Sequence, residues 1–488
     1  MYTPAAPEKM AELVFIPLAG MGHLVSVVEM AKLLVARNRD FSITILVMKL
    51  PFDSRGSAQL DSLAASLPAG RIRFLNLPHD DHSLAHLASA TSTRRILFNL
   101  VEYYKPRVRD AVAELASSDS IRLAGFIIDM FCTPMIDIAD EFHLPSYVFF
   151  TSGAAFLGFM LHLQCLLDER NQDLTELKDS DAELAIPTFA NPVPTKIMPL
   201  VALDEGASKM FFDHARRFRE TKGIIVNTFR ELEPYALGSI LDDPKVPPVY
   251  PVGPILNLHS STNQNLEIIE WLDDQPPLSV VFLCFGSMGS FGEDQVREIA
   301  HGIERSSHKF LWSLRRPPPK GKIDIPTDYA NPEDVLPEGF LDRTSDMGRV
   351  IGWAPQVAVL SHPAIGGFVS HCGWNSTLES LWCGVPLASW PIYAEQQMNA
   401  FEMVRELGLA VEITLDYKKE IIQEASRIVS ADDIERGIKC VMECDSEIRR
   451  KVKQKREESR KALVEGGSSY SSLGLFIDNV MNNMKSKV

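Results

Sequence analysis

Two side chains in the first third of the sequence have the chemistry of a general base and its partner. His23 follows a glycine-rich turn at the start of a predicted helix, and Asp129 ends the apolar run 123–128. An imidazole titrates near neutral pH, which suits a group that accepts a proton from a reacting hydroxyl. A carboxylate on the other ring nitrogen would orient the imidazole and stabilise its charged form. Asp137 and Asp140 are close in the sequence, but they fall on the following predicted helix. Taken alone, His23 is more simply explained as a polar residue at a helix end without a catalytic role.

A second group of polar side chains follows the apolar run 366–370, which predicts a strand. His371, Asn375 and Ser376 come next, and Ser376 with Glu379 matches a capping box, which predicts a helix that begins at Ser376. The free N–H groups and the dipole of a helix start attract anions, so a diphosphate would fit there. Ordinary helix capping explains the same residues without a ligand, and these residues alone leave both interpretations open.

The glycine-rich turn before His23 is a weak nucleotide signal. The turn contains Gly20 and Gly22 but lacks the third glycine of the dinucleotide fingerprint, because Val25 occupies that position. A nicotinamide-dependent oxidoreductase is therefore disfavoured.

The elements that must position these residues follow a strand–helix–strand order. The run 13–17 predicts a buried strand, the apolar positions within 24–35 recur at helical spacing, and 42–48 predicts a second strand. Such a unit indicates a parallel sheet. Further strands are predicted at 123–129, 146–150 and 223–227. Ligands bind at the carboxyl ends of such strands, where His23 and Asp129 are expected to meet.

The sequence then starts a second unit of the same kind. The proline-dense segment 244–254 is typical of an extended interdomain linker. A strand at 278–285, a turn at 286–290 and a helix at 294–305 then repeat the opening, and the proline-containing segment 317–332 predicts an exposed loop. Further strands are predicted at 310–314, 350–351, 367–370 and 386–390. The expected fold class is α/β, with two doubly wound domains that face each other across a cleft.

Composition and charge disfavour several classes of protein. The 488 residues carry a net charge of −15, which argues against a nucleic-acid binder. Seven cysteines, an odd number, form no evident disulfide framework or zinc site, which indicates a reducing compartment. Residues 1–12 do not resemble a signal peptide, and polar residues interrupt the apolar stretch 147–167, which predicts a buried strand and helix instead of a membrane span. We therefore expect a cytoplasmic protein without a structural metal.

The segment 353–396 resembles the signature box of the plant secondary-product (family 1) UDP-glycosyltransferases. The matching residues are Trp353-Ala354-Pro355-Gln356, His371-Cys372-Gly373-Trp374-Asn375-Ser376, Glu379, Gly384-Val385-Pro386 and Glu395-Gln396, without a gap. Gly22-His23, Ile128-Asp129 and the segment 251–254 extend the resemblance over essentially the whole chain. The chain is most similar to family members that glycosylate flavonoids, phenylpropanoids and terpenoids.

The resemblance implies a role for each matching residue. In the nucleotide, the uracil should stack on Trp353, with Ala354 and Gln356 nearby. The ribose hydroxyls should donate hydrogen bonds to Glu379. The residues expected to hold the diphosphate are Ser287, His371, Asn375 and Ser376. For the sugar, the expected contacts are Trp374, Glu395, Gln396 and, from the first domain, Thr151. The family uses the residue at His23 as the base and the one at Asp129 as its partner. Many relatives have Asp in place of Glu395, and Gln at position 396 is associated with glucose.

The resemblance also implies the GT-B fold and a reaction. The reaction is an inverting, metal-independent transfer of glucose from UDP-glucose, the co-substrate, to a hydroxyl of a small lipophilic acceptor such as a flavonoid, another phenolic or a terpenoid. The product would be a β-O-glucoside, and the helix start with His371 would neutralise the leaving diphosphate. No permanently bound cofactor and no metal is expected. The alternative is a non-catalytic UDP-sugar-binding protein, which would not need both His23 and Asp129.

The acceptor site and the domain limits complete the expectations. Apolar side chains that could line an acceptor pocket are Met130, Phe131, Phe149, Phe150 and Met160, although such residues are more often plain core. The expected parts are an acceptor-binding domain at 1–247, a linker at 248–265, a UDP-sugar-binding domain at 266–465 and, at 466–488, a helix that packs back on the first domain. We expect a monomer that binds a UDP-sugar and a small acceptor, with no nucleic acid and no membrane span.

Overall fold

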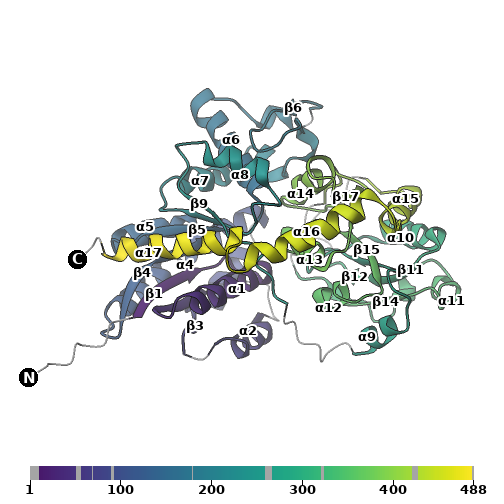
Figure 1. Cartoon of the computed structure of the whole chain (residues 1–488), viewed down its shortest axis with the longest axis horizontal. Coiled ribbons are helices and arrows are strands. Elements are labelled where there is room, and N and C mark those ends of the chain that lie inside the picture. Colours follow the sequence, from purple (N-terminus) through teal and green to yellow (C-terminus); the bar gives the residue numbers. More distant parts are fainter. Residues whose placement is uncertain are drawn as a thin grey trace, which may run out of the picture.

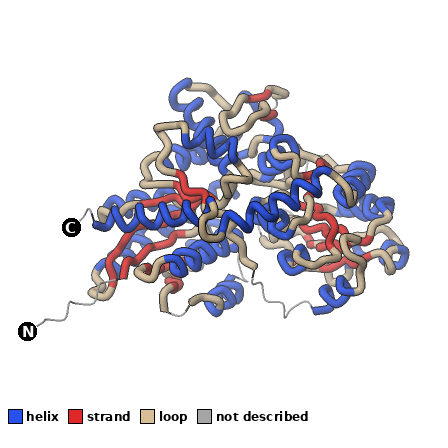
Figure 2. Tube along the Cα trace, in the orientation of Figure 1, coloured by secondary structure: helices blue, strands red, loops and turns tan. Residues whose placement is uncertain are grey.

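The computed structural model describes residues 10–50, 56–68, 70–88, 93–178, 180–258, 266–319, 324–419 and 427–485. These residues form two lobes, each built around a parallel sheet with helices on both faces (Figures 1 and 2). The prediction of an α/β protein with two Rossmann-like domains is confirmed.

The first sheet has the strand order β3-β2-β1-β4-β5-β8-β9, and all its neighbouring strands are parallel. Its strands are β1 (Met10–Ile16), β2 (Phe41–Val47), β3 (Ile72–Asn76), β4 (Ile121–Asp129), β5 (Ser146–Phe150), β8 (Ile224–Val226) and β9 (Val249–Pro251). In β1, Leu13 and Phe15 pack into the core on one face of the sheet, while Val14 and Ile16 pack into the core on the other. A strand that is buried on both faces is apolar throughout, which is why these runs could be recognised in the sequence.

Helices cover both faces of the first sheet. They are α1 (Met21–Arg37), α2 (Gly56–Ala65), α3 (Asp81–Ala88), α4 (Thr93–Ala116), α5 (Ile136–Glu141), α6 (Ala154–Arg170), α7 (Ser208–Phe218) and α8 (Pro234–Leu241). Buried residues of α1 and α2 belong to the core on one face, and those of α4 to α8 belong to the core on the other. The apolar stretch 147–167 is β5 followed by α6, as predicted.

The second sheet has the order β14-β11-β10-β15-β16-β17 and is also parallel. Its strands are β10 (Val280–Cys284), β11 (Lys309–Ser313), β14 (Gly348–Ile351), β15 (Ile365–Ser370), β16 (Leu387–Ser389) and β17 (Ala410–Glu412). Its helices are α9 (Leu266–Asp273), α10 (Glu293–Ser306), α11 (Phe340–Arg343), α12 (Gln356–Leu360), α13 (Trp374–Cys383), α14 (Gln396–Phe401) and α15 (Ala431–Met442).

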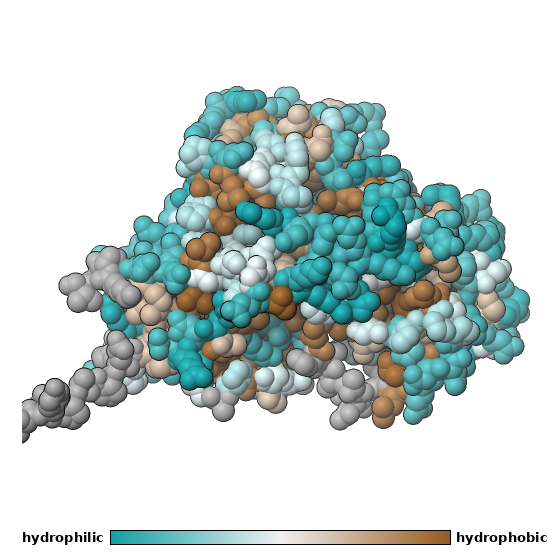
Figure 3. Space-filling model, in the orientation of Figure 1, coloured by the Kyte–Doolittle hydropathy of each residue, from teal (hydrophilic) through white to brown (hydrophobic). Residues whose placement is uncertain are grey.

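The last two helices together extend over both lobes, one helix on each. Figure 1 shows α16 (Glu447–Leu463) lying over the second lobe and α17 (Ser468–Lys485) lying lengthwise over the first. Helix α16 packs against α13, and α17 packs against β4, β9 and α1. The outer surface over α16 is strongly hydrophilic (Figure 3), as its many charged residues require. The chain therefore crosses between the lobes twice.

Two segments differ from the predictions. The segment expected to be a linker contributes β9, which pairs in parallel with β8 at the edge of the first sheet. Proline is tolerated on an edge strand, because one of its sides has no neighbour that needs a backbone N–H. The segment expected to be a loop at 317–332 contains β13 (Thr327–Asp328), which pairs with β12 (Arg315–Arg316) in a short antiparallel hairpin. A second such hairpin joins β6 (Glu183–Leu184) and β7 (Val193–Pro194).

Candidate active site

The predicted base and its partner are in direct contact. Nδ1 of His23 lies 2.6 Å from Oδ2 of Asp129, and Oδ1 of Asp129 accepts a hydrogen bond from the backbone N–H of Phe131 at 3.0 Å. The Asp129 side chain is fully buried, whereas 27% of the His23 side chain is exposed. The carboxylate therefore fixes one ring nitrogen, and the other nitrogen is left for a reacting hydroxyl.

The surroundings of His23 raise its pKa. Burial lowers the pKa, but the negative charges of Asp129 and Glu395 and the hydrogen bond to Asp129 outweigh burial, so the pKa lies above its ordinary value of 6.5. Glu395 belongs to the second domain, and burial raises the pKa of its carboxyl, with His23 acting in the opposite direction. Thr151, which follows β5, lies 3.4 Å from Nδ1 of His23 through its hydroxyl. Side chains from both domains thus meet around the imidazole.

In the second domain, two glycines flank the ring of His371. Gly286 follows β10 and Gly373 precedes α13, and a Cβ on either would lie 2.6 Å from Nε2 of His371. Gly286 also has φ +74°, a conformation that other residues adopt rarely. A side chain at either position would overlap the His371 ring, so glycine is required at both. Ser287, the residue after Gly286, is exposed beside them.

His371 is neutral at pH 7 in this environment. It is buried, and burial lowers its pKa to about 4. Its Nδ1 is buried and has no hydrogen-bond partner within the described part of the chain. The expectation that His371 neutralises a diphosphate by charge therefore needs correction. A neutral imidazole acts on an anion as a hydrogen-bond donor.

The start of α13 differs from the predicted capping box. The helix begins at Trp374, two residues before Ser376, and Gly373 occupies the cap position without a side-chain hydrogen bond. The capping-box prediction is wrong because Ser376 already lies in the first turn. The first N–H groups of α13 consequently have no capping side chain, and they remain available to an anion.

Ser376 and Glu379 belong to a different network. Nε2 of Gln356 donates to the Ser376 hydroxyl at 2.8 Å and to Oε2 of Glu379 at 2.6 Å. Burial raises the pKa of Glu379 to about 7, and its hydrogen bond with Gln356 opposes this shift. Three residues that were expected to bind the nucleotide are therefore brought together, and a carboxyl group is held where a diol could donate to it.

The two tryptophans of the signature box lie in opposite environments. Trp353 follows β14 and is 49% exposed, so its indole face is open for stacking, whereas Ala354 beside it is buried. Trp374 is 2% exposed, and its Nε1 donates to the backbone oxygen of Asn227 in the first domain at 2.7 Å. The predicted sugar contact of Trp374 cannot come from its side chain, because the indole is buried and its only polar group has a partner. Its backbone N–H at the helix start stays available.

Asn375 joins the two domains beside the base. Its Nδ2 donates to the backbone oxygen of Gly22 at 3.2 Å, and its Oδ1 lies 3.3 Å from the donating hydroxyl of Ser26. Gly22 immediately precedes His23, so a residue expected to hold the diphosphate is in contact with the helix turn that carries the base. The sequence offered no signal for this contact.

Gln396, the first residue of α14, is partly committed to the backbone. Its Oε1 accepts from the N–H groups of Ile392 at 2.9 Å and Tyr393 at 3.1 Å. These bonds fix the orientation of the amide.

The residues predicted for the acceptor pocket separate into two groups. Phe131 is partly exposed, and its ring lies edge-on to that of His23 with centroids 6.2 Å apart. Met130 is 3% exposed and belongs to the core, but its sulfur contacts the hydroxyl of Thr151 beside His23. The prediction is wrong for three others, Phe149, Phe150 and Met160, which are 0% exposed and belong to the cores of the first domain. Apolar runs at strand ends do not distinguish pocket walls from core.

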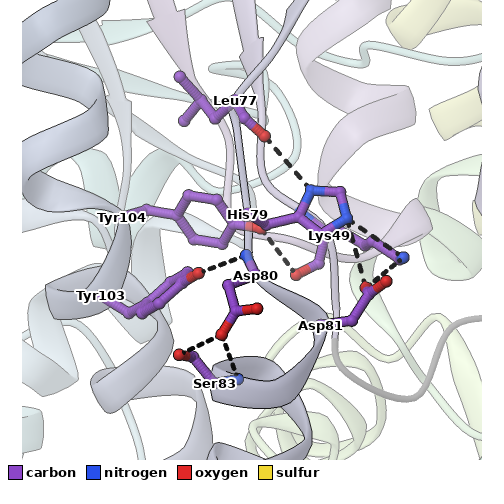
Figure 4. Close-up of polar contacts among 8 residues, drawn as sticks. All are labelled: Lys49, Leu77, His79, Asp80, Asp81, Ser83, Tyr103 and Tyr104. Carbon is purple, nitrogen blue, oxygen red and sulfur yellow. Dashed lines mark hydrogen bonds and ion pairs between the residues drawn. The ribbon is translucent and has the colours of Figure 1, made fainter.

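A polar cluster at the ends of β2 and β3 was not predicted. Figure 4 shows Nζ of Lys49 pointing at His79 and Asp81, with distances of 3.3 Å to Nε2 and 3.1 Å to Oδ1. On the other side of Asp80, the hydroxyl of Tyr103 of α4 accepts from the backbone N–H of Asp80 at 2.9 Å. The cluster lies at the same edge of the sheet as His23. Recognition of the run 72–76 as a strand would have placed it there.

Comparison with known proteins finds relatives along the whole chain. Residues 246–444 match the family model described as UDP-glucoronosyl and UDP-glucosyl transferase. The chain is 57% identical to UDP-glucose flavonoid 3-O-glucosyltransferase 6 of Fragaria ananassa, over 98% of this chain and 100% of that protein.

Solved structures also resemble the chain over nearly its whole length. A UGT transferase from Siraitia grosvenorii in complex with UDP is 51% identical, with a TM-score of 0.86 over 96% of this chain and all of that one. Medicago truncatula UGT71G1 complexed with UDP-glucose is 41% identical, with a TM-score of 0.85 over 96% of this chain and 98% of that one. The GT-B fold is thereby confirmed. No helix in the described ranges combines the length and the apolar character of a membrane span.

Proposed function

The chain belongs to the UDP-glucoronosyl and UDP-glucosyl transferase family and is a UDP-dependent glycosyltransferase, and on that premise we propose that it transfers glucose from UDP-glucose to a hydroxyl of a flavonoid, another phenolic or a terpenoid. One observation carries the proposal. The His23–Asp129 pair of the first domain faces the start of α13 in the second, and Asn375 of α13 hydrogen-bonds to Gly22 beside the base. A donor bound at α13 would lie against an acceptor bound at His23.

His23 acts as the general base of the transfer. Its free ring nitrogen takes the proton of the acceptor hydroxyl, while Asp129 stabilises the imidazolium that forms. The acceptor oxygen bonds to the anomeric carbon as the bond from that carbon to the diphosphate oxygen breaks. Attack from the face opposite the leaving group inverts the configuration, so an α-linked donor gives a β-O-glucoside.

The leaving diphosphate is held by hydrogen-bond donors, and no metal takes part. The uncapped N–H groups of α13, the neutral imidazole of His371 and the hydroxyls of Ser287 and Ser376 supply these donors. Glycine at position 286 leaves room for the His371 ring, which lies against the backbone at this point. Such preorganised donors stabilise the charge that develops on the leaving group.

The rest of the donor is recognised by groups with matching chemistry. The exposed indole of Trp353 stacks on the uracil, and Glu379, oriented by Gln356, accepts from the ribose hydroxyls. The NH₂ group of Gln396, Glu395 and Thr151 contact the hydroxyls of the glucose. Phe131 and Met130 form the apolar wall for the acceptor beside His23.

The two domains divide these tasks. Residues 1–247 bind the acceptor and residues 266–465 bind the UDP-sugar, joined by the connection 248–265, and the helix in 466–488 ties the second domain back to the first. The contacts of α17 with β4, β9 and α1 support this division. We place a monomeric enzyme in the cytoplasm, a reducing compartment that suits its seven free cysteines.

Product analysis tests the proposal. The purified chain is incubated with UDP-glucose and a panel of flavonoids, simple phenols and terpenoid alcohols, with and without a chelator. The expected products gain one hexose in the mass spectrum, show the proton coupling of a β-glucoside by NMR and form equally well with chelator. UDP binding without any product would support the non-catalytic alternative, and loss of product with chelator would contradict the metal-independent mechanism.

A further inference from the structure

The polar cluster at the ends of β2 and β3 has no task in the mechanism proposed above. Its positive charge is Lys49, which comes shortly after β2 and has a side chain that is 47% exposed. Within the described ranges, Nζ of Lys49 has two hydrogen-bond partners, Oδ1 of Asp81 at 3.1 Å and Nε2 of His79 at 3.3 Å (Figure 4). An ammonium group carries three N–H donors, so one donor of Lys49 is left for a ligand.

His79 holds the ammonium group of Lys49 without neutralising its charge. Nδ1 of His79 lies 3.5 Å from the backbone oxygen of Leu77, and we therefore assign the ring proton to Nδ1. Nε2 then accepts the hydrogen bond from Nζ of Lys49, as a neutral imidazole does. The positive charge of the cluster consequently stays on Lys49.

Two tyrosines of α4 fix the backbone of the cluster. The hydroxyl of Tyr104, which is fully buried, accepts from the backbone N–H of Lys49 at 3.1 Å. The hydroxyl of Tyr103 accepts from the backbone N–H of Asp80 at 2.9 Å. The two rings support each other, since they lie edge-on with centroids 5.1 Å apart. Both loops of the cluster are therefore held in place before a ligand binds, which lowers the entropic cost of binding.

Asp81 is a weak partner for Lys49. It is the first residue of α3, and its side chain is 82% exposed. An ion pair between exposed groups contributes little, because water solvates both charges and competes for them. A carboxylate carried by a bound molecule can therefore replace Asp81 at the ammonium group of Lys49.

The cluster lies near the place where an acceptor would meet His23. Strand β2 pairs with β1 and β3 pairs with β2, all in parallel, so the three strands end at the same edge of the sheet. Neighbouring strands are ~4.8 Å apart, which places the end of β3 about 10 Å from the end of β1. Met48 and Leu77, which follow β2 and β3, belong to the same apolar core as Met130, which follows β4. An elongated acceptor with its hydroxyl at His23 can therefore extend along this edge to Lys49.

We propose that Lys49, held by His79, binds a carboxylate at the end of the acceptor that is remote from the hydroxyl receiving glucose. The proposal rests on the function proposed above and names phenolic acids as an acceptor class that the protein selects. Lys49 supplies the attraction for the carboxylate, and Asp81 is the counter-ion that the carboxylate displaces. Substitutions of these two residues should therefore change the selectivity in opposite directions.

The test compares two acceptors, 4-coumarate and methyl 4-coumarate, which have the same phenol and differ in the negative charge. The measured quantity is the ratio of kcat/KM for the acid to kcat/KM for the ester, with the full-length protein and UDP-glucose. K49M should lower this ratio roughly tenfold, the size expected for the loss of a hydrogen bond to a charged group. D81N should raise the ratio roughly two- to fivefold, because a competing exposed carboxylate is removed.

K245M is the matched control for the loss of a lysine. Lys245 forms an exposed ion pair with Glu169 and precedes β9, so it lies at the opposite edge of the sheet. The ratio in K245M should equal that of the wild type. An unchanged ratio in K49M would overturn the proposal, and so would a lowered ratio in D81N.

A binding measurement keeps this test separate from the proposed function. Calorimetry with 4-coumarate in the absence of UDP-glucose should show an affinity roughly tenfold lower in K49M than in the wild type. Equal affinities would reject the site even if glucose transfer is confirmed, whereas a difference of this size would uphold it even if no product forms. Formation of a glucose ester of 4-coumarate, identified by NMR, would place the carboxylate at His23 and would also overturn the proposal.

Discussion

Nδ1 of His23 lies 2.6 Å from Oδ2 of Asp129, although 106 positions separate the two residues in the sequence. Each follows or ends a strand of the first sheet, and β1 and β4 are direct neighbours in that sheet. The contact therefore results from parallel pairing, which places the ends of both strands at one edge. Because the carboxylate is buried and the imidazole is partly open, the pair is built to hold a proton at one defined position.

Replacement of His23 by Ala should strongly lower the rate of glucose transfer and leave the affinity for the UDP-sugar donor unchanged. Loss of a general base lowers turnover roughly 10²–10⁴-fold. The dissociation constant of UDP should stay close to the wild-type value, because none of the residues proposed to bind UDP is held in place by the His23 side chain. Single-turnover rates and calorimetry measure the two effects. H308A, a histidine of the second domain away from this edge, is the control and should turn over normally. Turnover of H23A at the wild-type rate would remove His23 from the mechanism.

The pH profile should report the influence of Asp129 on the base. The pKa of His23 is raised, so kcat/KM in the wild type should increase with pH as the ring loses its proton, with a midpoint above 6.5. In D129N the raising charge is gone and burial remains, which lowers the pKa. The acid limb of D129N should therefore shift to lower pH, and its maximal rate should fall. A midpoint that is the same in both proteins would contradict the charge coupling inferred from the contact.

Donor affinity should depend on the protonation of Glu379. Its pKa is raised to about 7, so in the ligand-free protein the carboxyl is mostly protonated below pH 7 and charged above it. The ribose hydroxyls donate best to the charged form, and binding of UDP-glucose should strengthen as the pH rises through 7. E379Q should bind roughly tenfold or more weakly, since a hydrogen bond to a charged group contributes ~1.5–3 kcal/mol. Its affinity should not change with pH over this range. Calorimetry at several pH values measures this dependence. If the affinity of E379Q changed with pH in the same way as that of the wild type, Glu379 would not be the group responsible.

The two tryptophans should respond in opposite ways to replacement by Ala. Trp353 is half exposed, and W353A should weaken UDP binding by ~1–3 kcal/mol, the range for stacking of a base on an aromatic ring. Its free energy of unfolding should change little. Trp374 is buried, and W374A should lower the free energy of unfolding by ~3–5 kcal/mol. Urea unfolding and calorimetry on both variants separate the effects. If W353A destabilised the fold as much as W374A, its indole would be structural.

Some of this protein can be read directly from local sequence. Buried parallel strands are short apolar runs, and helices such as α1 and α10 have apolar residues at helical spacing, so both sheets and their order of elements were predictable. Strands β3, β9 and β17 were missed, because a strand that is very short, has a partly polar face or contains several prolines lacks the apolar run.

The sequence by itself therefore determined which residue types stand at the strand ends and which chemistry they can perform. Side-chain chemistry and position pointed to His23 and Asp129, and the resemblance of the segment 353–396 to a known family pointed to Trp353 and Glu379. The tertiary structure alone decided which of these groups are open and which are buried. It buried the indole of Trp374 at the contact with Asn227 of the first domain, and it buried His371, which lowers the pKa of that imidazole to about 4. Burial and contact between distant segments arise only when the two sheets face each other, and no local pattern encodes them.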